Sequence, residues 1–262
     1  MKEVKYEGVG YLKAGNGPAI ILLHGYLETK EIWTDFAKDL SKDFEVIIPD
    51  LSGHGESVLI DNNLTVEKMA TGVKKVLDNE NIKQCFLVGH SMGGYVALAF
   101  LDLYPEFLSA LSLFHSSPYP DTDEKRKNRD REINIIRQGK KSQVYTAHFP
   151  KTFAPENVEK FQKEIEQMKE RAKKMSDEGI IAALEAMKKR PDRSGLLQKT
   201  DIPIQYIIGE KDNFIPMSIL EKLKLPENSE LVVLENSGHN GFIEEKKNAL
   251  EAVGGFYKNI LK

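Results

Sequence analysis

Short apolar runs, each bounded by turn residues, recur along the chain and predict buried strands. Runs of this length with β-branched residues are typical of strands that are covered on both faces of a parallel sheet. Residues 4–12 alternate more weakly and predict antiparallel strands at the sheet edge. The apolar runs lie at residues 19–23, 46–48, 85–88, 110–114, 204–208 and 231–234.

Helical patterns lie between several of these runs. Residues 65–80 place apolar side chains at helical spacing behind Thr65, which stands where it can cap the first turn. Residues 95–103 and 249–261 are further candidate helices. Because strands and helices alternate, the pattern predicts an α/β fold with a mostly parallel sheet flanked by helices on both faces.

The pattern changes near Pro118. Residues 119–198 contain long, charge-rich helical stretches in place of buried strands, at 123–138, 155–175 and 176–189. We therefore expect a core of residues 1–118 and 199–262, with residues 119–198 inserted as a helical cap or lid. This segment carries 19 Lys and Arg against 14 Asp and Glu. Solvated helix faces explain that excess, and so does attraction of an anionic substrate.

Composition narrows the class of protein. A net charge of −3 over 262 residues gives no reason to expect nucleic acid or an anionic membrane as a partner. No apolar run approaches the roughly 18 residues of a membrane span. The first residues contain no apolar stretch typical of a secretory signal. Cys85 is the single cysteine, which excludes an intramolecular disulfide and a cysteine metal cluster, and we expect a cytoplasmic protein.

A candidate nucleophile follows the run at 85–88. Residues 89–93 read Gly-His-Ser-Met-Gly and match the G-x-S-x-G pattern, with a strand before them and a helix after them. In such an elbow the serine sits on a strained turn, and glycines flank it because the two arms pass too close for side chains. This context assigns Ser91 as the nucleophile.

Serine needs an adjacent base to attack at neutral pH. His239 follows the last strand in a Ser-Gly-His sequence, and Asp212 follows the strand before it. The resulting order of Ser91, Asp212 and His239 is the one expected when an acid orients the histidine of a triad in this topology. Glu210 and Glu235 are weaker candidates for the acid.

An oxyanion needs two preorganised N–H donors. The backbone N–H of Met92 directly follows the nucleophile, and the loop after the run at 19–23 offers the N–H of Tyr26. His24 in that loop is a second choice for the base, and His54 is expected to be structural. His115 ends a strand, and both a place in the site and a structural role fit it.

The sequence gives little support for a metal site or a phosphate-binding loop. The histidines are scattered and lack H-E-x-x-H spacing, so we expect no metal site. No glycine-rich loop ends in Lys-Ser or Lys-Thr, which a phosphate-binding loop requires.

With these motifs the sequence resembles the α/β-hydrolase superfamily, and in particular its capped carboxylesterase and enol-lactonase-like members. The resemblance implies a hydrolase core, a helical lid and no required cofactor. Ser52 stands where relatives often have proline. Haloalkane dehalogenases and epoxide hydrolases of this fold use an aspartate nucleophile, so Ser91 argues against both chemistries. The matching residues are 23–26, 49–57, 89–94, 209–212 and 237–239.

The expected activity is hydrolysis of a small ester or lactone through an acyl-enzyme, with a small molecule as the partner. A C–C bond hydrolase and an acyltransferase can use the same triad, and a non-enzymatic ligand sensor on this fold is a third alternative. Substrate identity and oligomeric state stay open.

Overall fold

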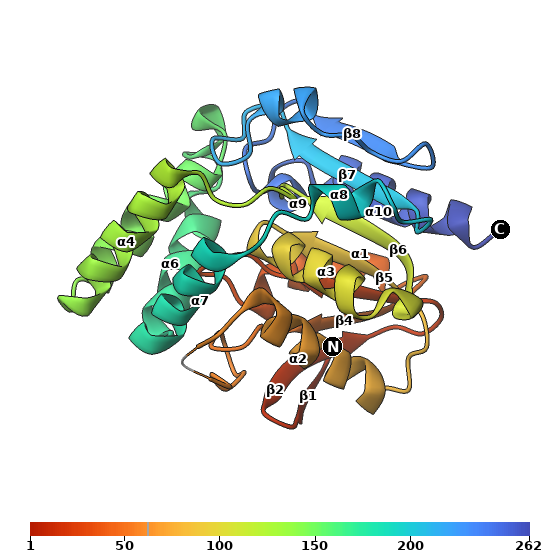
Figure 1. Ribbon diagram of the computed structural model, residues 1–262, viewed down its shortest axis with the longest axis horizontal. Helices are drawn as coiled ribbons and strands as arrows, with labels where there is room; N and C mark the ends of the chain where they lie inside the picture. The colour runs from red at the N-terminus through yellow and green to blue at the C-terminus, as the bar shows by residue number, and fades with distance from the viewer. Residues whose placement is uncertain (62) are drawn as a thin grey trace.

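The computed structural model describes residues 1–61 and 63–262, which form an eight-stranded sheet in the order β1-β2-β4-β3-β5-β6-β7-β8 (Figure 1). Strands β3 to β8 run parallel, as the apolar runs predict. The strands are β1 (Lys2–Tyr6), β2 (Val9–Ala14), β3 (Ala19–Leu23), β4 (Glu45–Pro49), β5 (Cys85–His90), β6 (Leu108–Phe114), β7 (Ile204–Gly209) and β8 (Glu230–Leu234).

The N-terminal edge of the sheet is antiparallel. β1 pairs with β2, and β2 pairs with β4. The stretch predicted at residues 4–12 is therefore two strands, because Glu7 and Gly8 adopt φ angles of 44° and 81° and turn the chain between them. At the centre of the sheet, β3 and β5 are buried along their whole length.

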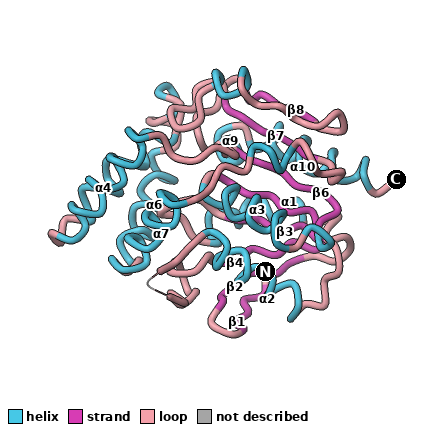
Figure 2. The backbone as a smooth tube through the Cα atoms, viewed as in Figure 1, coloured by secondary structure: helices cyan, strands magenta, loops and turns pink. Residues whose placement is uncertain are grey.

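Helices cover both faces of the sheet, as expected (Figure 2). Along β3, Ile21 belongs to one apolar cluster and Ile20 to the other, because successive side chains of a strand point to opposite faces. Helices α2 and α3 pack on the first face, and α1 and α10 pack on the second. These helices are α1 (Thr34–Leu40), α2 (Val66–Asn79), α3 (Met92–Leu103) and α10 (Lys246–Ile260), with α9 (Gly241–Glu244) before the last.

Helix α2 forms where the sequence predicts it. The Thr65 side chain accepts a hydrogen bond of 3.3 Å from the Lys68 N–H, which caps the first turn. Short 3₁₀ helices connect other elements. They are η1 (Lys30–Trp33), η2 (Pro105–Phe107), η3 (Phe149–Thr152), η4 (Pro155–Asn157) and η5 (Met217–Glu221).

The chain between β6 and β7 is helical. Figure 1 shows α4, α6 and α7 side by side at one end of the sheet. The helix predicted at 155–175 is shorter than expected, since the Asn157 side chain donates to the Asn236 carbonyl and to Glu244, both at 2.8 Å, which fixes a separate 3₁₀ turn. The helices are α4 (Asp123–Arg137), α5 (Lys141–His148), α6 (Gln162–Lys174), α7 (Asp177–Lys189) and α8 (Ser194–Leu197).

Four neighbouring parallel strands end at the same edge of the sheet. Ser91 follows β5, His115 follows β6, Asp212 follows β7 and His239 follows β8. Ligands of open α/β sheets bind outside this carboxyl edge. Within residues 1–61 and 63–262, no helix combines the length and apolar character that a membrane crossing requires.

Candidate active site

Ser91 occupies a strained turn between β5 and α3. Its φ of 50° and ψ of −114° are unusual for a residue with a side chain. A Cβ on Gly89 would lie 2.5 Å from the Gly93 carbonyl oxygen, and a Cβ on Gly93 would lie 2.6 Å from the Leu23 carbonyl oxygen. Because the backbone arms approach this closely, only glycine fits on either side of the serine.

Asp212 and His239 meet above β7 and β8. The Nδ1–H of His239 donates to Oδ2 of Asp212 at 2.8 Å. The other carboxylate oxygen accepts from the N–H groups of Phe214 and Ile215, at 2.7 and 2.9 Å. Burial alone would raise the pKa of Asp212, yet His239 and His115 hold it well below its usual range. Asp212 is therefore a fixed carboxylate, and its bond to Nδ1–H leaves Nε2 as the ring nitrogen of His239 with a lone pair.

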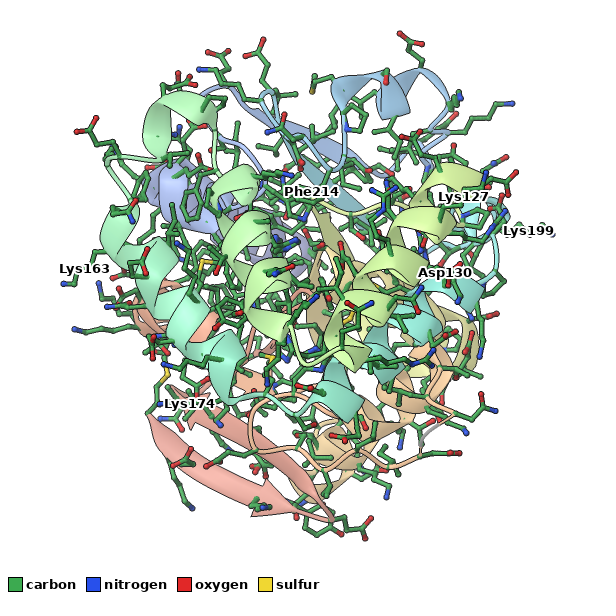
Figure 3. All side chains as sticks on the ribbon, turned by 90° about the vertical axis from the view of Figure 1, so that its left-hand side faces the viewer. Lys127, Asp130, Lys163, Lys174, Lys199 and Phe214 are labelled. Atoms are coloured by element: carbon green, nitrogen blue, oxygen red, sulfur yellow. The ribbon has the colours of Figure 1, made fainter. Side chains whose placement is uncertain are left out.

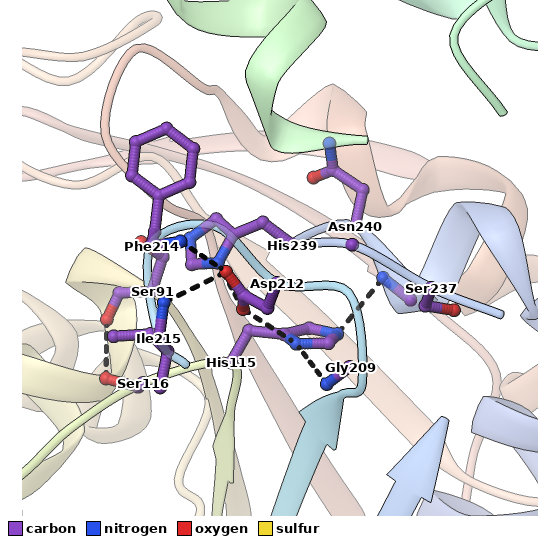
Figure 4. A network of polar contacts seen from close by, with 12 residues as sticks. Ser91, His115, Ser116, Gly209, Asp212, Phe214, Ile215, Ser237, His239 and Asn240 are labelled. Atoms are coloured by element: carbon purple, nitrogen blue, oxygen red, sulfur yellow. Dashed lines mark hydrogen bonds and ion pairs between the residues drawn. The ribbon is translucent and has the colours of Figure 1, made fainter. Parts of the chain in front are cut away.

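Ser91 and His239 follow β5 and β8 at the same edge of the sheet, and Figure 4 draws both. In the part of the chain that the structure describes, no hydrogen bond joins the Ser91 hydroxyl to the His239 ring. Apo geometry of catalytic hydrogen bonds is often long and tightens when substrate binds. The Ser116 hydroxyl donates to the Ser91 carbonyl oxygen at 2.8 Å, which fixes the elbow from the β6 side.

The two expected oxyanion donors are backbone N–H groups of Tyr26, in the loop after β3, and of Met92, directly after Ser91. Met92 is the first residue of α3, so its N–H belongs to the unpaired set at a helix N-terminus. In the neighbouring loop the N–H of Gly25 is already bonded to Glu28 at 2.6 Å. Among the described residues, no acceptor pairs with the N–H of Tyr26 or of Met92. This pair of donors is thus available to a ligand oxygen.

Known proteins share this fold. A family model described as the alpha/beta hydrolase fold matches residues 18–246. The chain belongs to the alpha/beta hydrolase fold family. A solved structure of a thermophilic esterase from Thermogutta terrifontis is similar to this hydrolase at a TM-score of 0.93 and 26% identity, over 99% of both chains. The resemblance inferred from the sequence is confirmed.

Two other similar proteins carry names of other activities. An enol-lactonase from Burkholderia xenovorans LB400 shares the fold at a TM-score of 0.88 and 20% identity, over 98% of this hydrolase and 100% of that chain. A putative 2-succinyl-6-hydroxy-2,4-cyclohexadiene-1-carboxylate synthase of Bacillus subtilis strain 168 is 27% identical over 97% of each chain.

A buried ion pair next to the elbow was not anticipated from the sequence of this hydrolase. His90 directs Nδ1 at Glu28 at 3.0 Å and Nε2 at the His239 carbonyl at 2.8 Å. Both partners only accept hydrogen bonds, so both ring nitrogens carry protons and the ring is charged. Burial would lower the pKa of His90, but Glu28 holds it above its usual value. The spacing of Glu28, three residues after Gly25, is the local signal that could have found the pair.

The alternative candidates for the base and the acid differ in their surroundings. His24 donates from Nδ1 to the Gly25 carbonyl and accepts from the Leu51 N–H, both at 2.9 Å, and burial lowers its pKa to about 4. It shapes the loop, and among the described residues its ring forms no hydrogen bond with Ser91 or Asp212. Glu210 and Glu235 are exposed, whereas Asp212 is buried and bonded to His239.

Aromatic rings pack beside His239, some of them from the helical segment. Phe214 lies 5.0 Å from the His239 ring centroid, and His148 of α5 lies 5.2 Å from Phe214 and 5.5 Å from Tyr26. The Tyr26 hydroxyl donates to Glu132 of α4 at 3.2 Å. His148 and Glu132 were not found from the sequence, because nothing local indicates which face of a helix covers a distant loop.

The positive charge of the helical segment is largely paired or exposed. Arg129 and Arg190 both bind the carboxylate of Asp121, so two cations of the segment share one anion within it. Lys127 and Lys163 are exposed and stand at opposite margins of the segment in Figure 3, away from Phe214. Solvated helix faces and internal ion pairs account for these four cations, and attraction of an anionic substrate stays a prediction.

His115, Asp212 and His239 offer ligand atoms within 4.8 Å of one another. Each of these groups is already hydrogen bonded, with Oδ1 of Asp212 held by two backbone N–H groups and Nδ1 of His239 directed at Oδ2. The arrangement fits a hydrogen-bonded catalytic network rather than a metal coordination sphere.

Proposed function

We propose that this α/β hydrolase is a serine esterase or lactonase with Ser91 as nucleophile, His239 as base and Asp212 as acid. The observation that carries the proposal is the 2.8 Å bond between the buried Asp212 carboxylate and Nδ1 of His239, on the carboxyl edge where the strained Ser91 turn also lies. The similarity to the Thermogutta terrifontis esterase supports an ester substrate.

The mechanism proceeds in two halves. Nε2 of His239 takes the Ser91 hydroxyl proton as Oγ attacks the ester carbonyl, and Asp212 stabilises the resulting imidazolium. The N–H groups of Tyr26 and Met92 hold the oxyanion, a contribution of roughly 10²–10³-fold in rate for each donor. His239 returns its proton to the departing alcohol, and an acyl-enzyme remains on Ser91. Water then attacks that ester by the same route and releases the acid.

Residues 119–198 are proposed to be the cap over this site. Contacts between Glu132 and Tyr26, and between His148 and Phe214, support the assignment, since they join helices α4 and α5 to the loops around Ser91. The cap would select a small-molecule substrate by shape, because its contacts with the site are mainly aromatic.

The nucleophile is tested by incubating the protein with a fluorophosphonate and locating the adduct by peptide mass spectrometry. Ser91 should be labelled in the native protein, and Ser91→Ala should lose both labelling and hydrolysis of short p-nitrophenyl esters. Ser142→Ala, which removes an exposed hydroxyl of α5, serves as the control. Full esterase activity in Ser91→Ala would refute the assignment.

The similarity to a protein named as a putative carboxylate synthase, whose name is not that of an esterase, favours a second candidate, a C–C bond hydrolase reaction at the same triad. Acyl transfer is a further outcome of that chemistry. A panel of p-nitrophenyl esters, lactones and vinylogous diketones, with and without an added alcohol acceptor, separates the three by the substrate consumed and the product formed.

A further inference from the structure

His115 contacts the acid of the proposed triad. It follows β6, its side chain is fully buried, and its Nδ1 lies 3.2 Å from Oδ2 of Asp212 (Figure 4). Oδ2 is the same oxygen that receives the bond from His239. Two histidines from different strands therefore converge on one carboxylate oxygen.

The backbone holds the His115 ring at both nitrogens. The Gly209 N–H lies 3.0 Å from Nδ1, and the Gly241 N–H lies 3.1 Å from Nε2. A neutral imidazole has one N–H and one lone pair. With a proton on Nδ1, the ring donates to Asp212 and accepts from the Gly241 N–H, and the Gly209 N–H loses its acceptor. With a proton on Nε2, the ring accepts from the Gly209 N–H alone, and its Nδ1 lone pair faces the carboxylate. The contacts thus favour Nδ1–H, which donates to Asp212.

The chain is tightly packed around this ring. A Cβ on Gly241 would lie 2.6 Å from Nε2 of His115 and closer still to Cδ1 of Leu234. A Cβ on Gly209 would lie 3.0 Å from Cε1 of His115 and closer still to the Gly238 carbonyl oxygen. His115 itself adopts a φ of 49°, a conformation that costs energy for a residue with a side chain. The ring is therefore held in one place beside the carboxylate.

We propose that His115 is a positioning residue that fixes the Asp212 carboxylate through an Nδ1–H···Oδ2 hydrogen bond, so that the carboxylate orients His239. This inference rests on the proposed triad. With His115 in place, each oxygen of Asp212 accepts two hydrogen bonds, from Phe214 and Ile215 on one side and from the two histidines on the other.

The ring acts in its neutral form. Burial lowers the pKa of His115 to about 4, although Asp212 opposes the shift, and the nearby His239 and His90 add to the lowering. These three are the titratable groups that face the ring from β7, β8 and β5. Near pH 7, His115 is then a hydrogen-bond donor without a charge of its own.

Removing the donor should have two effects. The carboxylate becomes freer to rotate, so kcat falls about tenfold with little change in KM, the lower end of the range for loss of a supporting hydrogen bond. The unshared negative charge also stabilises protonated His239 more strongly. The pH at which kcat/KM reaches half its maximum on the acid side should therefore move upward by a few tenths of a unit.

The experiment compares His115→Asn with His115→Leu. These two side chains have nearly the same shape, and only asparagine keeps an N–H near the position of Nδ1; it also tolerates positive φ well. Turnover of p-nitrophenyl butyrate is measured from pH 5 to 9 and divided by the active fraction, which is titrated with a fluorophosphonate. His54→Leu, at a buried histidine without contact to Asp212 or His239, controls for loss of a buried ring.

The expected result is a tenfold lower kcat and an upward pH shift in His115→Leu, with recovery to within about threefold in His115→Asn. Equal kcat and pH profiles in the two variants would overturn the inference, as would a pH shift of the same size in His54→Leu. If His115→Leu yields little folded protein, the pH midpoint still decides, because it does not depend on the amount of active enzyme. The proposed triad is tested separately. Esterase activity in Ser91→Ala would refute the triad itself, whereas the results above refute only the role of His115.

Discussion

The buried pair of Glu28 and His90 offers a quantitative test of how this hydrolase holds its catalytic loops. Glu28→Gln keeps the shape of the side chain and can still accept the Gly25 N–H, but it removes the carboxylate charge beside His90. The charged imidazole then either stays buried without a counter-ion or loses its proton together with one hydrogen bond. Both outcomes destabilise the folded state.

The magnitude follows from the carboxyl group. Burial would raise the pKa of Glu28, but His90 and the Gly25 N–H bring it from 4.5 to about 2. At about 1.4 kcal/mol per pKa unit, this difference corresponds to about 3 kcal/mol of stability. The figure agrees with the roughly 3–5 kcal/mol that removal of one partner of a buried ion pair costs.

The effect should depend on pH in a defined sense. Glu28 has a folded-state pKa below its unfolded value, so its contribution is present above about pH 4.5 and is lost as the pH falls toward 2. His90 has a raised pKa, so its contribution is present below about pH 6.5 and is lost as the pH rises through the raised value. The difference between wild type and Glu28→Gln should therefore be largest between about pH 4.5 and 6.5.

Guanidinium unfolding followed by circular dichroism at pH 6 and pH 9 measures this difference by linear extrapolation. Glu235→Gln is the control, since Glu235 is exposed and its substitution should change stability by less than about 0.5 kcal/mol. If Glu28→Gln at pH 6 is as stable as Glu235→Gln, the pair does not carry charge and the reasoning fails. Equal losses at pH 6 and pH 9 would contradict the protonation of His90.

Three further outcomes are expected. Asp212→Asn should lower kcat by about 10⁴-fold while the protein remains folded, because the amide stabilises the wrong tautomer of the base; a loss below tenfold would argue against Asp212 as the acid. Gly93→Ala should lower the melting temperature, since its Cβ would lie 2.6 Å from a backbone oxygen. Gly255→Ala, whose Cβ would have no atom within 4 Å, should not lower it. Equal melting temperatures of the two variants would contradict the elbow geometry. Cys85 is buried, and burial raises the pKa of its thiol. A disulfide reagent should therefore modify it only after unfolding. Rapid labelling of the native protein would contradict this prediction.

The sequence predicted what depends on local order. The strand, the Gly-His-Ser-Met-Gly turn and the following helix are contiguous, so a pattern of a few residues identifies Ser91. Asp212 and His239 follow from topology, because each lies just beyond a parallel strand and such strands end at one edge. The fold class and the family could be predicted for the same reason.

What the sequence missed depends on contacts between distant segments. His90 and Glu28 are separated by 62 positions, and His90 and His239 by 149. His115 had two open interpretations, since a histidine at a strand end reads the same whether it meets a carboxylate or fills space. The contact with Asp212 exists only because β6 and β7 are neighbours in the sheet, with His115 at the end of one and Gly209 at the end of the other.

The base of the proposed triad is held at two points, which explains why the polar groups around it are so closely linked. Asp212 fixes the His239 ring through Nδ1, and His90 fixes the His239 backbone through its carbonyl oxygen. His90 is bound in turn by Glu28, which also binds Gly25 beside the proposed oxyanion donor Tyr26. A shift of the oxyanion loop would therefore disturb the base as well. Because one buried ion pair joins the two loops, their substitutions should be non-additive, and a double variant at Glu28 and His90 should lose less stability than the two single losses together.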